Sequence, residues 1–302
     1  MSTAEAPPRP GGVAPVTGGT VRPGVVRPWL RMLGSELGLI FRRWRNLLLL
    51  AVLIGIPVLL GIALRVSVPR GGNGGGDGLG AAFLFQVAGN GVFLAFLALT
   101  VMLTLVLPLV VAVVSGDSLA GEASAGTLRY LLAVPAGRSR LLSVKYAAIV
   151  VFSLISCLLV AASALIMGVA LFPVGPVTLL SGTTVPLSEG LLRLLLVVLY
   201  VSAAMAMLGA IGLAISSFTE HPIAAIAAIL IIAVASEVAD NVPQFAVVQP
   251  YLPTHWWLSF DSLLRTPIDT TELTHGLLSI GVYIVIFCSI AWAKFSNADV
   301  TS

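Results

Sequence analysis

The chain has 302 residues, of which 58% are hydrophobic and only 10% are charged, and its formal net charge is +3. Soluble domains carry about 25% charged residues, so this composition excludes an ordinary soluble protein and predicts a polytopic membrane protein. The small net charge gives no indication of nucleic-acid binding. Cys157 and Cys288 both lie inside apolar runs, where we expect small hydrophobic side chains rather than a disulfide or a metal pair.

Residues 1–26 are rich in Pro, Gly, Ala and Thr and contain no apolar block. They predict a disordered cytoplasmic tail without a signal peptide. The next segment, 28–45, is amphipathic: its apolar side chains share one arc of a helix, and Glu36 and Arg43 fall at the edge of that arc. Many arginines beside a tryptophan-bearing apolar face are typical of a helix in the membrane interface. The alternative is a cytoplasmic extension of the first span.

A helix needs about 20 mostly apolar residues to cross the bilayer core. Six segments qualify, and they predict an all-α protein with six transmembrane helices: 46–64, 83–114, 146–171, 191–215, 222–238 and 276–293. The second segment is longer than a bilayer requires, so it should tilt or project into water. The fourth segment repeats small residues every four positions, which predicts a close-packed helix face.

Basic residues give the orientation, since Lys and Arg collect on the cytoplasmic side of a membrane. Seven arginines precede the first span, four basic residues lie between the second and third spans, and Lys294 follows the sixth. We therefore expect a multi-pass protein of a bacterial plasma membrane in which both termini and the connector 116–145 are cytoplasmic.

Two outer segments differ in kind. Residues 70–80 read as a flexible glycine linker. Residues 239–275 mix prolines with aromatic side chains, and we expect them to dip into the outer leaflet as one or two short helices. His255 and His275 lack partners at metal-ligand spacing, so no metal site is predicted there. Glu237 and Asp240 end the fifth span, either as a cation site or as solvated carboxylates.

The second span carries polar residues that share one arc of the expected helix: Gln86, Asn90, Thr100, Thr104 and Ser115. Polar side chains inside a bilayer face protein or water rather than lipid. This stripe either lines a transport path between two subunits or forms hydrogen bonds with neighbouring helices.

The connector 116–145 concentrates the charges of an otherwise apolar chain. Helical spacing over 118–132 places Ser118, Glu122, Gly126 and Arg129 on one arc. Pro135 should then stop the helix. We expect a short helix at the membrane base that docks into a partner's groove. The alternative is a solvated helix whose arginines only enforce topology, although acidic residues such as Glu122 contribute little to topology.

From Gly121 to Lys145 the connector reads G-E-x-x-x-G-T-L-R-x-L-L-x-x-P-x-x-R-x-R-x-x-x-x-K. This pattern resembles the connector of ABC-2-type permeases, the membrane subunits of bacterial ABC exporters. The resemblance implies one transmembrane domain over 27–302, with an interfacial helix and a cytoplasmic coupling helix between spans two and three. It also implies a set of residues that contact the ATPase: Asp117, Glu122, Gly126, Thr127, Arg129, Pro135, Arg138, Arg140 and Lys145. Family tails often carry a basic residue where this chain has Ala298, which leaves a tail contact open.

A P-loop needs Gly-Lys-Ser or Gly-Lys-Thr, whereas the two lysines here follow Val144 and Ala293. We therefore expect no enzymatic activity and no cofactor in this chain, with ATP and Mg²⁺ bound by two copies of a partner ATPase. A second permease subunit would complete a homodimer or heterodimer. The expected substrate is drug-like, peptidic or otherwise amphiphilic. Alternatives are export of a lipid or glycan, a membrane-embedded enzyme, or a scaffold protein.

Overall fold

The computed structural model describes residues 26–67, 90–126, 138–179 and 181–296. The predicted tail before residue 26 and the glycine linker 70–80 lie outside these ranges. The helices are α1 (Val26–Arg42), α2 (Trp44–Ser67), α4 (Phe93–Thr104), α5 (Val106–Ser124), α7 (Arg138–Leu171), α8 (Leu187–Ser216), α9 (Pro222–Asp240) and α10 (Thr270–Ser296). Two short strands, β1 (Val177–Thr178) and β2 (Thr184–Val185), pair antiparallel.

Six of these helices are long and apolar enough to cross a membrane: α2, α5, α7, α8, α9 and α10. The prediction of an all-α, multi-pass membrane protein is therefore confirmed. The predicted spans correspond in order to these helices, with α4 and α5 together covering the described part of the second. The third and sixth helices begin several residues before the predicted apolar segments, because polar residues at their starts also adopt helical structure.

The second span is not one helix, as the sequence had predicted, but two that are separated at Leu105. Pro108 provides the physical reason. A proline has no N–H to donate to the carbonyl four residues earlier, and its ring crowds that carbonyl. Here that carbonyl belongs to Thr104, the last residue of α4. Pro57 lies inside α2, which continues without interruption.

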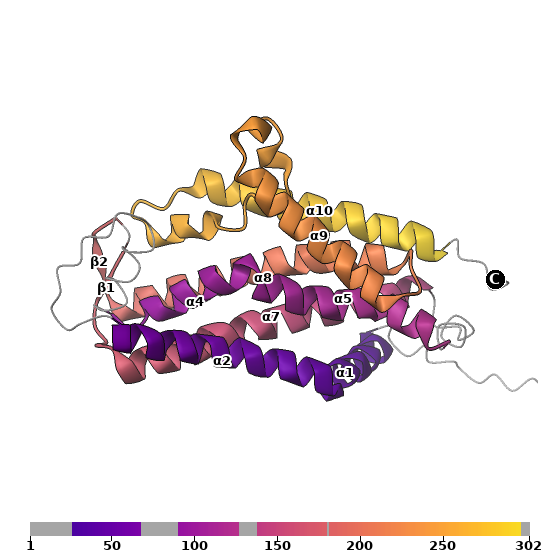
Figure 1. Ribbon diagram of the computed structural model, residues 1–302, viewed down its shortest axis with the longest axis horizontal. Coiled ribbons are helices and arrows are strands. Elements are labelled where there is room, and N and C mark those ends of the chain that lie inside the picture. The colour runs from indigo at the N-terminus through magenta and orange to yellow at the C-terminus, as the bar shows by residue number, and fades with distance from the viewer. Residues whose placement is uncertain (1–25, 68–89, 127–137, 180, 297–302) are drawn as a thin grey trace, which may run out of the picture.

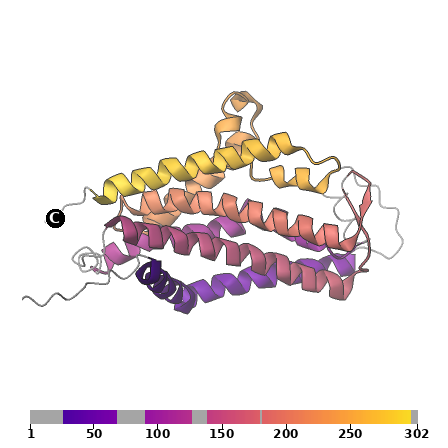
Figure 2. The ribbon, with the colours of Figure 1, turned by 180° about the vertical axis from the view of Figure 1, so that it is seen from behind.

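The helices form two layers. From behind, α10, α8, α7 and α2 lie side by side in that order (Figure 2). On the other face, α4 and α5 pack over this layer and α9 crosses at an angle (Figure 1). In the most apolar stretch of α8, 78% of the residues are buried, against 17% for α10 and 22% for α9, so α8 is the central helix. Its predicted close-packed face is confirmed, since Gly209 meets Ile149 of α7 and Gly212 meets Ser115 of α5.

The segment between α9 and α10 contains three short 3-10 helices, η1 (Pro243–Phe245), η2 (Gln249–Tyr251) and η3 (Ser259–Leu264). The first two project sideways from the bundle (Figure 1), and Tyr251 is 74% exposed there. In contrast, η3 is buried through Phe260 and Leu264. Short helices were expected here, but there are three rather than one or two. Their depth in a membrane stays a prediction.

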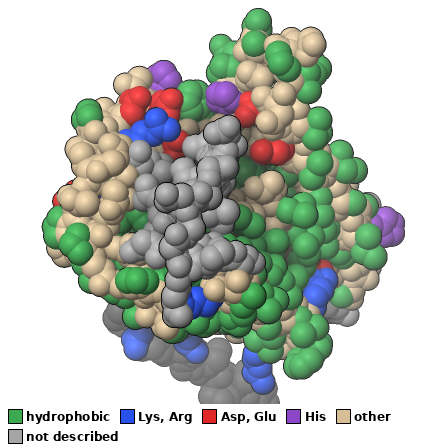
Figure 3. Space-filling view, turned by 60° about the vertical axis from the view of Figure 1, so that its left-hand side comes forward, with side chains coloured by type: hydrophobic (Ala, Val, Ile, Leu, Met, Phe, Trp, Pro, Cys, Tyr) green, Lys and Arg blue, Asp and Glu red, His purple; other side chains and the backbone are tan. Residues whose placement is uncertain are grey.

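The two ends of the bundle differ in composition. One end carries the β-hairpin, where charged and histidine side chains gather beside a flank of apolar side chains (Figure 3). The other end holds α1, the end of α5, the start of α7 and the end of α10 (Figure 1). We call the second end the inner end, because the sequence predicts that it faces the cytoplasm.

Candidate functional site

Six charged side chains from four helices meet at the inner end. We call them the inner charge cluster: Glu36 of α1, Arg43 between α1 and α2, Arg45 of α2, Asp117 and Glu122 of α5, and Lys145 of α7. Three are acidic and three are basic, so the cluster is neutral when all are ionised. It lies where the two ends of the connector enter the bundle.

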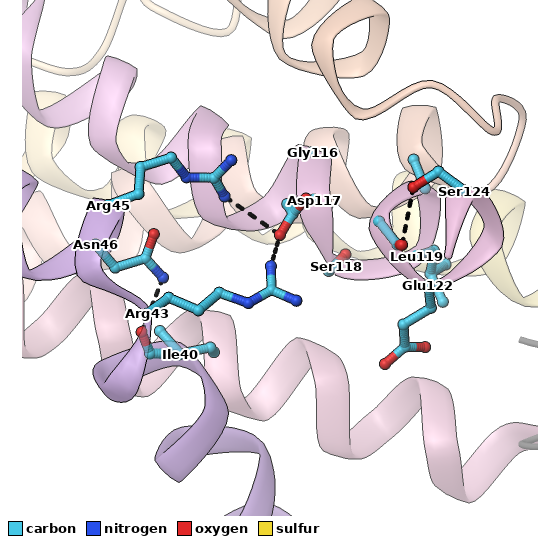
Figure 4. Close-up of polar contacts among 12 residues, drawn as sticks. Ile40, Arg43, Arg45, Asn46, Gly116, Asp117, Ser118, Leu119, Glu122 and Ser124 are labelled. Carbon is cyan, nitrogen blue, oxygen red and sulfur yellow. Dashed lines mark hydrogen bonds and ion pairs between the residues drawn. The ribbon is translucent and has the colours of Figure 1, made fainter. Parts of the chain in front are cut away.

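Asp117 receives two arginines. Arg43 and Arg45 both pair with its Oδ2, the second at 3.2 Å, as Figure 4 shows. The Asp117 side chain is only 12% exposed, whereas both arginines are about half exposed. Because Arg43 is the residue at the break between α1 and α2, these ion pairs fasten the bend between those helices to α5.

Lys145 bridges two carboxylates. Its Nζ lies 2.6 Å from Glu122 Oε1 and 3.4 Å from Glu36 Oε1, and its side chain is only 2% exposed. Removing a charge from water is costly unless it is paired, so these two carboxylates are what allow an ammonium to be buried here. The bridge joins both ends of the connector to α1.

The inner charge cluster surrounds a small cavity. About 50 Å³ is open to the centres of water molecules, which is room for several water-sized groups, because one such group needs about 10–15 Å³. Its lining comes from α1, α2, α5 and α7: Glu36, Leu39, Ile40, Arg43, Asn46, Val114, Asp117, Ser118, Glu122, Lys145, Ala148 and Ile149.

Asn46, a neutral polar residue of this lining, has an amide oxygen that receives no donor from the described residues. It is 2% exposed, and its Nδ2 donates to the backbone oxygen of Ile40 at 2.9 Å. Within the part of the chain that the structure describes, Asn46 Oδ1 has no hydrogen-bond donor. A buried acceptor without a donor costs about 1–3 kcal/mol, so the cavity offers a favourable position to a group that carries N–H or O–H.

One face of α1 packs against α7. Trp29 Nε1 donates to Ser143 Oγ at 3.1 Å, and the Phe41 ring lies 5.7 Å from that of Phe152. Glu36 points from the same face towards Lys145. Its position at the edge of the apolar arc, which looked like an imperfection in the sequence pattern, is thus explained by a buried cation on the neighbouring helix.

The inner end of α5 is also held by α8. Ser216 Oγ donates to the backbone oxygen of Gly116 at 2.8 Å and accepts from the backbone N–H of Ala120 at 2.8 Å. Gly116 and Ala120 are the two ends of one helical turn, so a single hydroxyl makes hydrogen bonds to both ends of that turn. Ser216 is 1% exposed, and we expect its loss to loosen α5 where the connector begins.

The prediction of one helix running from 118 through Gly126 is wrong. Residues from Ser118 to Ser124 are the last turns of α5, and Gly126 lies in the turn that follows, with a φ of +69°. Left-handed backbone of this kind favours glycine. Gly126 therefore does not share a helical arc with Glu122, and it is exposed without a close neighbour among the described residues.

The remaining connector residues are placed only in part. Thr127, Arg129 and Pro135 lie outside the described residues, and Arg138 begins α7 with its side chain not described. Arg140 is partly exposed on the first turn of α7. Contact of these residues with an ATPase stays a prediction. Asp117, Glu122 and Lys145 make ion pairs within the chain, which the sequence had not indicated.

The predicted polar stripe is not continuous. Asn90 precedes α4 and is buried, with Nδ2 donating to the backbone oxygens of Gly175 and Pro176. Thr100 and Thr104 donate to backbone oxygens of their own helix, and Gln86 lies outside the described residues. Ser115 lies beyond the break at Leu105, is fully buried, and donates to the backbone oxygen of Val111. Thr104 is exposed beside the break.

Away from the inner end, His255 Nδ1 lies 2.5 Å from Asp240 Oδ1, a contact that sequence spacing did not reveal. The Trp256 ring packs between the rings of His255 and His275. Within the described ranges, no group of three or more His, Cys, Asp or Glu side chains is arranged to hold a metal ion.

Sequence reasoning missed several residues of the inner site: Glu36, Arg43, Arg45, Asn46 and Ser216. Glu36 had a detectable signal, because an acid beside an apolar arc indicates a buried partner. Arg43 lies at the same edge of the arc, but positive-inside charge accounted for both arginines. Asn46 and Ser216 lie at the ends of apolar runs, where polar residues are ordinary.

A bundle of six membrane-spanning helices with a charged inner end defines a multi-pass membrane protein of the all-α class. Residues 48–301, most of the chain, match the model of a protein family of unknown function, DUF2705. The chain belongs to this family. No curated protein was found to match it.

Proposed function

We propose that the chain is the permease subunit of an ATP-driven exporter, of the kind that the ABC-2 resemblance implies. It would work as a homodimer or heterodimer with two copies of a separate ATPase, which binds ATP and Mg²⁺. The substrate class is drug-like, peptidic or otherwise amphiphilic. The inner end faces the cytoplasm of a bacterium in this proposal.

The observation that carries the proposal is the inner charge cluster. The connector leaves the bundle from α5 and returns at α7, and the pair of Glu122 with Lys145 ties these two ends to each other and to Glu36 of α1. A partner that moves the connector would thus move α1, α5 and α7 together. Transporters switch between inward and outward access by such displacements of packed helices.

In this proposal α1 lies in the membrane interface. Its outward side carries arginines and exposed apolar residues, such as Leu30 at 54% and Leu39 at 58% exposed, while its other face packs on α7. Apolar side chains that protrude among arginines suit the boundary between headgroups and acyl chains.

The transport path would run past the α4–α5 break. Thr104 and Leu105 are exposed there, on the face that carries α9 (Figure 1). A helix break presents backbone oxygens as well as side chains, which suits a path for amphiphilic molecules. A second subunit would close the path.

The test is co-purification. The tagged chain is co-expressed with the ATPase encoded by neighbouring genes, and complex formation and ATP turnover are measured. Arg129→Ala should weaken capture of the ATPase by about 2 kcal/mol or more, or about 30-fold, if it belongs to a desolvated interfacial ion pair. Gly126→Ala should also weaken capture, because an alanine resists φ of +69°.

The matched control is Arg265→Ala. Arg265 lies near the β-hairpin end and is exposed, with an ion pair only to the exposed Asp261 among the described residues, so capture should be unchanged. Equal capture by the parent and both connector variants would contradict the docking role of the connector. ATP hydrolysis by the pure chain alone would contradict the separate ATPase.

A further inference from the structure

The cavity within the inner charge cluster differs from a simple ion-pair network in one respect, the bare acceptor Asn46 Oδ1. Every carboxylate of the cluster has a cationic partner, and the cluster is neutral. A net cation or a net anion would upset that balance in a poorly solvated place. The cavity therefore suits a ligand with no net charge that still brings N–H donors.

The mouth of the cavity carries exposed cationic side chains, whereas its interior holds amide and carboxylate oxygens. Arg43 and Arg45, which both pair with Asp117, are about half exposed. Asn46 and the carboxylates lie deeper. A zwitterion with an ammonium at its tip and an anionic group behind it would match this order, with the ammonium on Asn46 Oδ1 and the anion among the arginines.

The cavity lies at the level of the lipid headgroups, where zwitterions of this kind are abundant. Asn46 lies in the first turn of α2, whose membrane-spanning stretch begins at Trp44. The start of a span is at the level of the lipid headgroups, whichever way the chain is oriented. Trp44, two residues before Asn46, is 73% exposed, as expected for a tryptophan at that level.

We propose that this cavity is a binding site for a phosphoethanolamine group, in which Asn46 Oδ1 and the carboxylates of Glu36 and Asp117 take the primary ammonium and Arg43 and Arg45 take the phosphate. The group is supplied by phosphatidylethanolamine or by free phosphoethanolamine. A primary ammonium has three N–H donors, whereas the trimethylammonium of phosphatidylcholine has none. The site is therefore selective for the first over the second, independently of the exporter function.

The test compares lipids that differ only in the headgroup. The detergent-purified full chain is titrated with dioleoyl phosphatidylethanolamine, phosphatidylcholine or phosphatidylglycerol, and binding is followed by native mass spectrometry and by the unfolding temperature. We expect at least tenfold tighter binding of phosphatidylethanolamine than of either other lipid. Equal binding of the ethanolamine and choline lipids would overturn the proposal, since the N–H donors of the headgroup would then make no difference to binding.

Two variants locate the site. Asn46→Leu removes the bare acceptor without changing charge, and Glu36→Gln removes one carboxylate, so each should reduce the preference for ethanolamine over choline at least fivefold. The matched control is Asn241→Leu, because Asn241 also donates from Nδ2 to a backbone oxygen but is exposed directly after the end of α9. An undiminished preference in folded Asn46→Leu and Glu36→Gln proteins would overturn the assignment to this cavity.

A third arm separates the two sources. Free phosphoethanolamine is added at millimolar concentration to lipid-free protein, with phosphocholine as its control. If free phosphoethanolamine stabilises the lipid-free protein and phosphocholine does not, the headgroup is sufficient for binding. Stabilisation by the lipid but not by free phosphoethanolamine would identify the membrane lipid as the ligand. Both results support the site, and failure of both molecules contradicts it.

Discussion

Lys145 is the most deeply buried charge of the inner charge cluster, and two carboxylates face it. Its burial is permitted by their charge, and their proximity to each other is permitted by its charge. Neither half of this arrangement is stable alone. A sequence cannot show such a dependence, because Glu36 and Lys145 are separated by 109 positions, and each has an ordinary explanation on its own helix.

Lys145→Met should destabilise the protein by about 3–5 kcal/mol, the usual cost of removing one partner from a buried ion pair. The methionine fills a similar volume, so the loss reports on charge. Thermal unfolding in detergent measures it. Arg140→Met is the control, since Arg140 is partly exposed one turn earlier. Adding Glu36→Gln and Glu122→Gln to Lys145→Met should restore much of the loss, and a triple variant no more stable than Lys145→Met would contradict the ion-pair explanation.

Arg193 performs a comparable task at the other end. Its guanidinium donates to Glu189 on its own helix and to the backbone oxygens of Leu263 and Arg265 at 2.7 and 3.1 Å, and the residue is 7% exposed. It therefore fastens η3 to α8. In the sequence Arg193 is only an arginine near the start of an apolar segment.

Arg193→Met should leave those two backbone oxygens without donors, at a cost of about 1–3 kcal/mol for each buried group. We expect faster amide exchange over 259–266 and a lower unfolding temperature. Hydrogen exchange followed by mass spectrometry measures the first. Arg265→Met, which removes only an exposed ion pair, should change neither quantity. Unchanged exchange over 259–266 in Arg193→Met would show that apolar packing alone holds η3.

Among the elements, apolar length predicted the existence and order of the membrane-spanning helices well, because the bilayer fixes the length that a helix needs. Breaks within helices were predicted less well. Pro57 and Pro108 both lie inside apolar runs, yet only Pro108 accompanies an interruption. Apolar length does not distinguish the two prolines. Helical periodicity likewise predicted that the connector helix continues beyond Gly126. A glycine in left-handed conformation commonly follows the end of a helix, and periodicity does not show this conformation.

Pro108→Ala should allow α4 and α5 to join, because the new N–H can donate to the carbonyl of Thr104. A proline inside a helix costs about 3 kcal/mol, so amide exchange over 105–109 should slow by tenfold or more. If the break serves transport as proposed, substrate-coupled ATP turnover of the assembled complex should fall. Pro57→Ala is the matched control and should not alter turnover. Unchanged exchange over 105–109 would show that packing, not Pro108, imposes the break.

At the scale of the whole molecule, composition alone defined the class, and the distribution of charge along the chain predicted which segments share an end. The structure places α1, the connector ends and the end of α10 together at the inner end (Figure 1), as that distribution required. The site within this end was less accessible to sequence reasoning. Positive-inside charge and ion pairing both select arginine and lysine near span ends, so composition cannot separate a topology signal from a buried partner.

Orientation in the membrane is the last prediction, and single-cysteine labelling in intact cells tests it. Cys157→Ala and Cys288→Ala give a background without thiols. Thr183 in the β-hairpin and Ser139 at the start of α7 are both exposed and lie at opposite ends of the bundle. We expect Thr183→Cys, and cysteines introduced within 71–80, to react with an impermeant maleimide in intact cells. Ser139→Cys should react only after lysis, because twelve of the basic residues flank the ends of the spans on its side. The reverse pattern would place the connector outside the cell, where no ATPase could reach it, and would remove the physical basis for the exporter proposal while leaving the fold and the headgroup site intact.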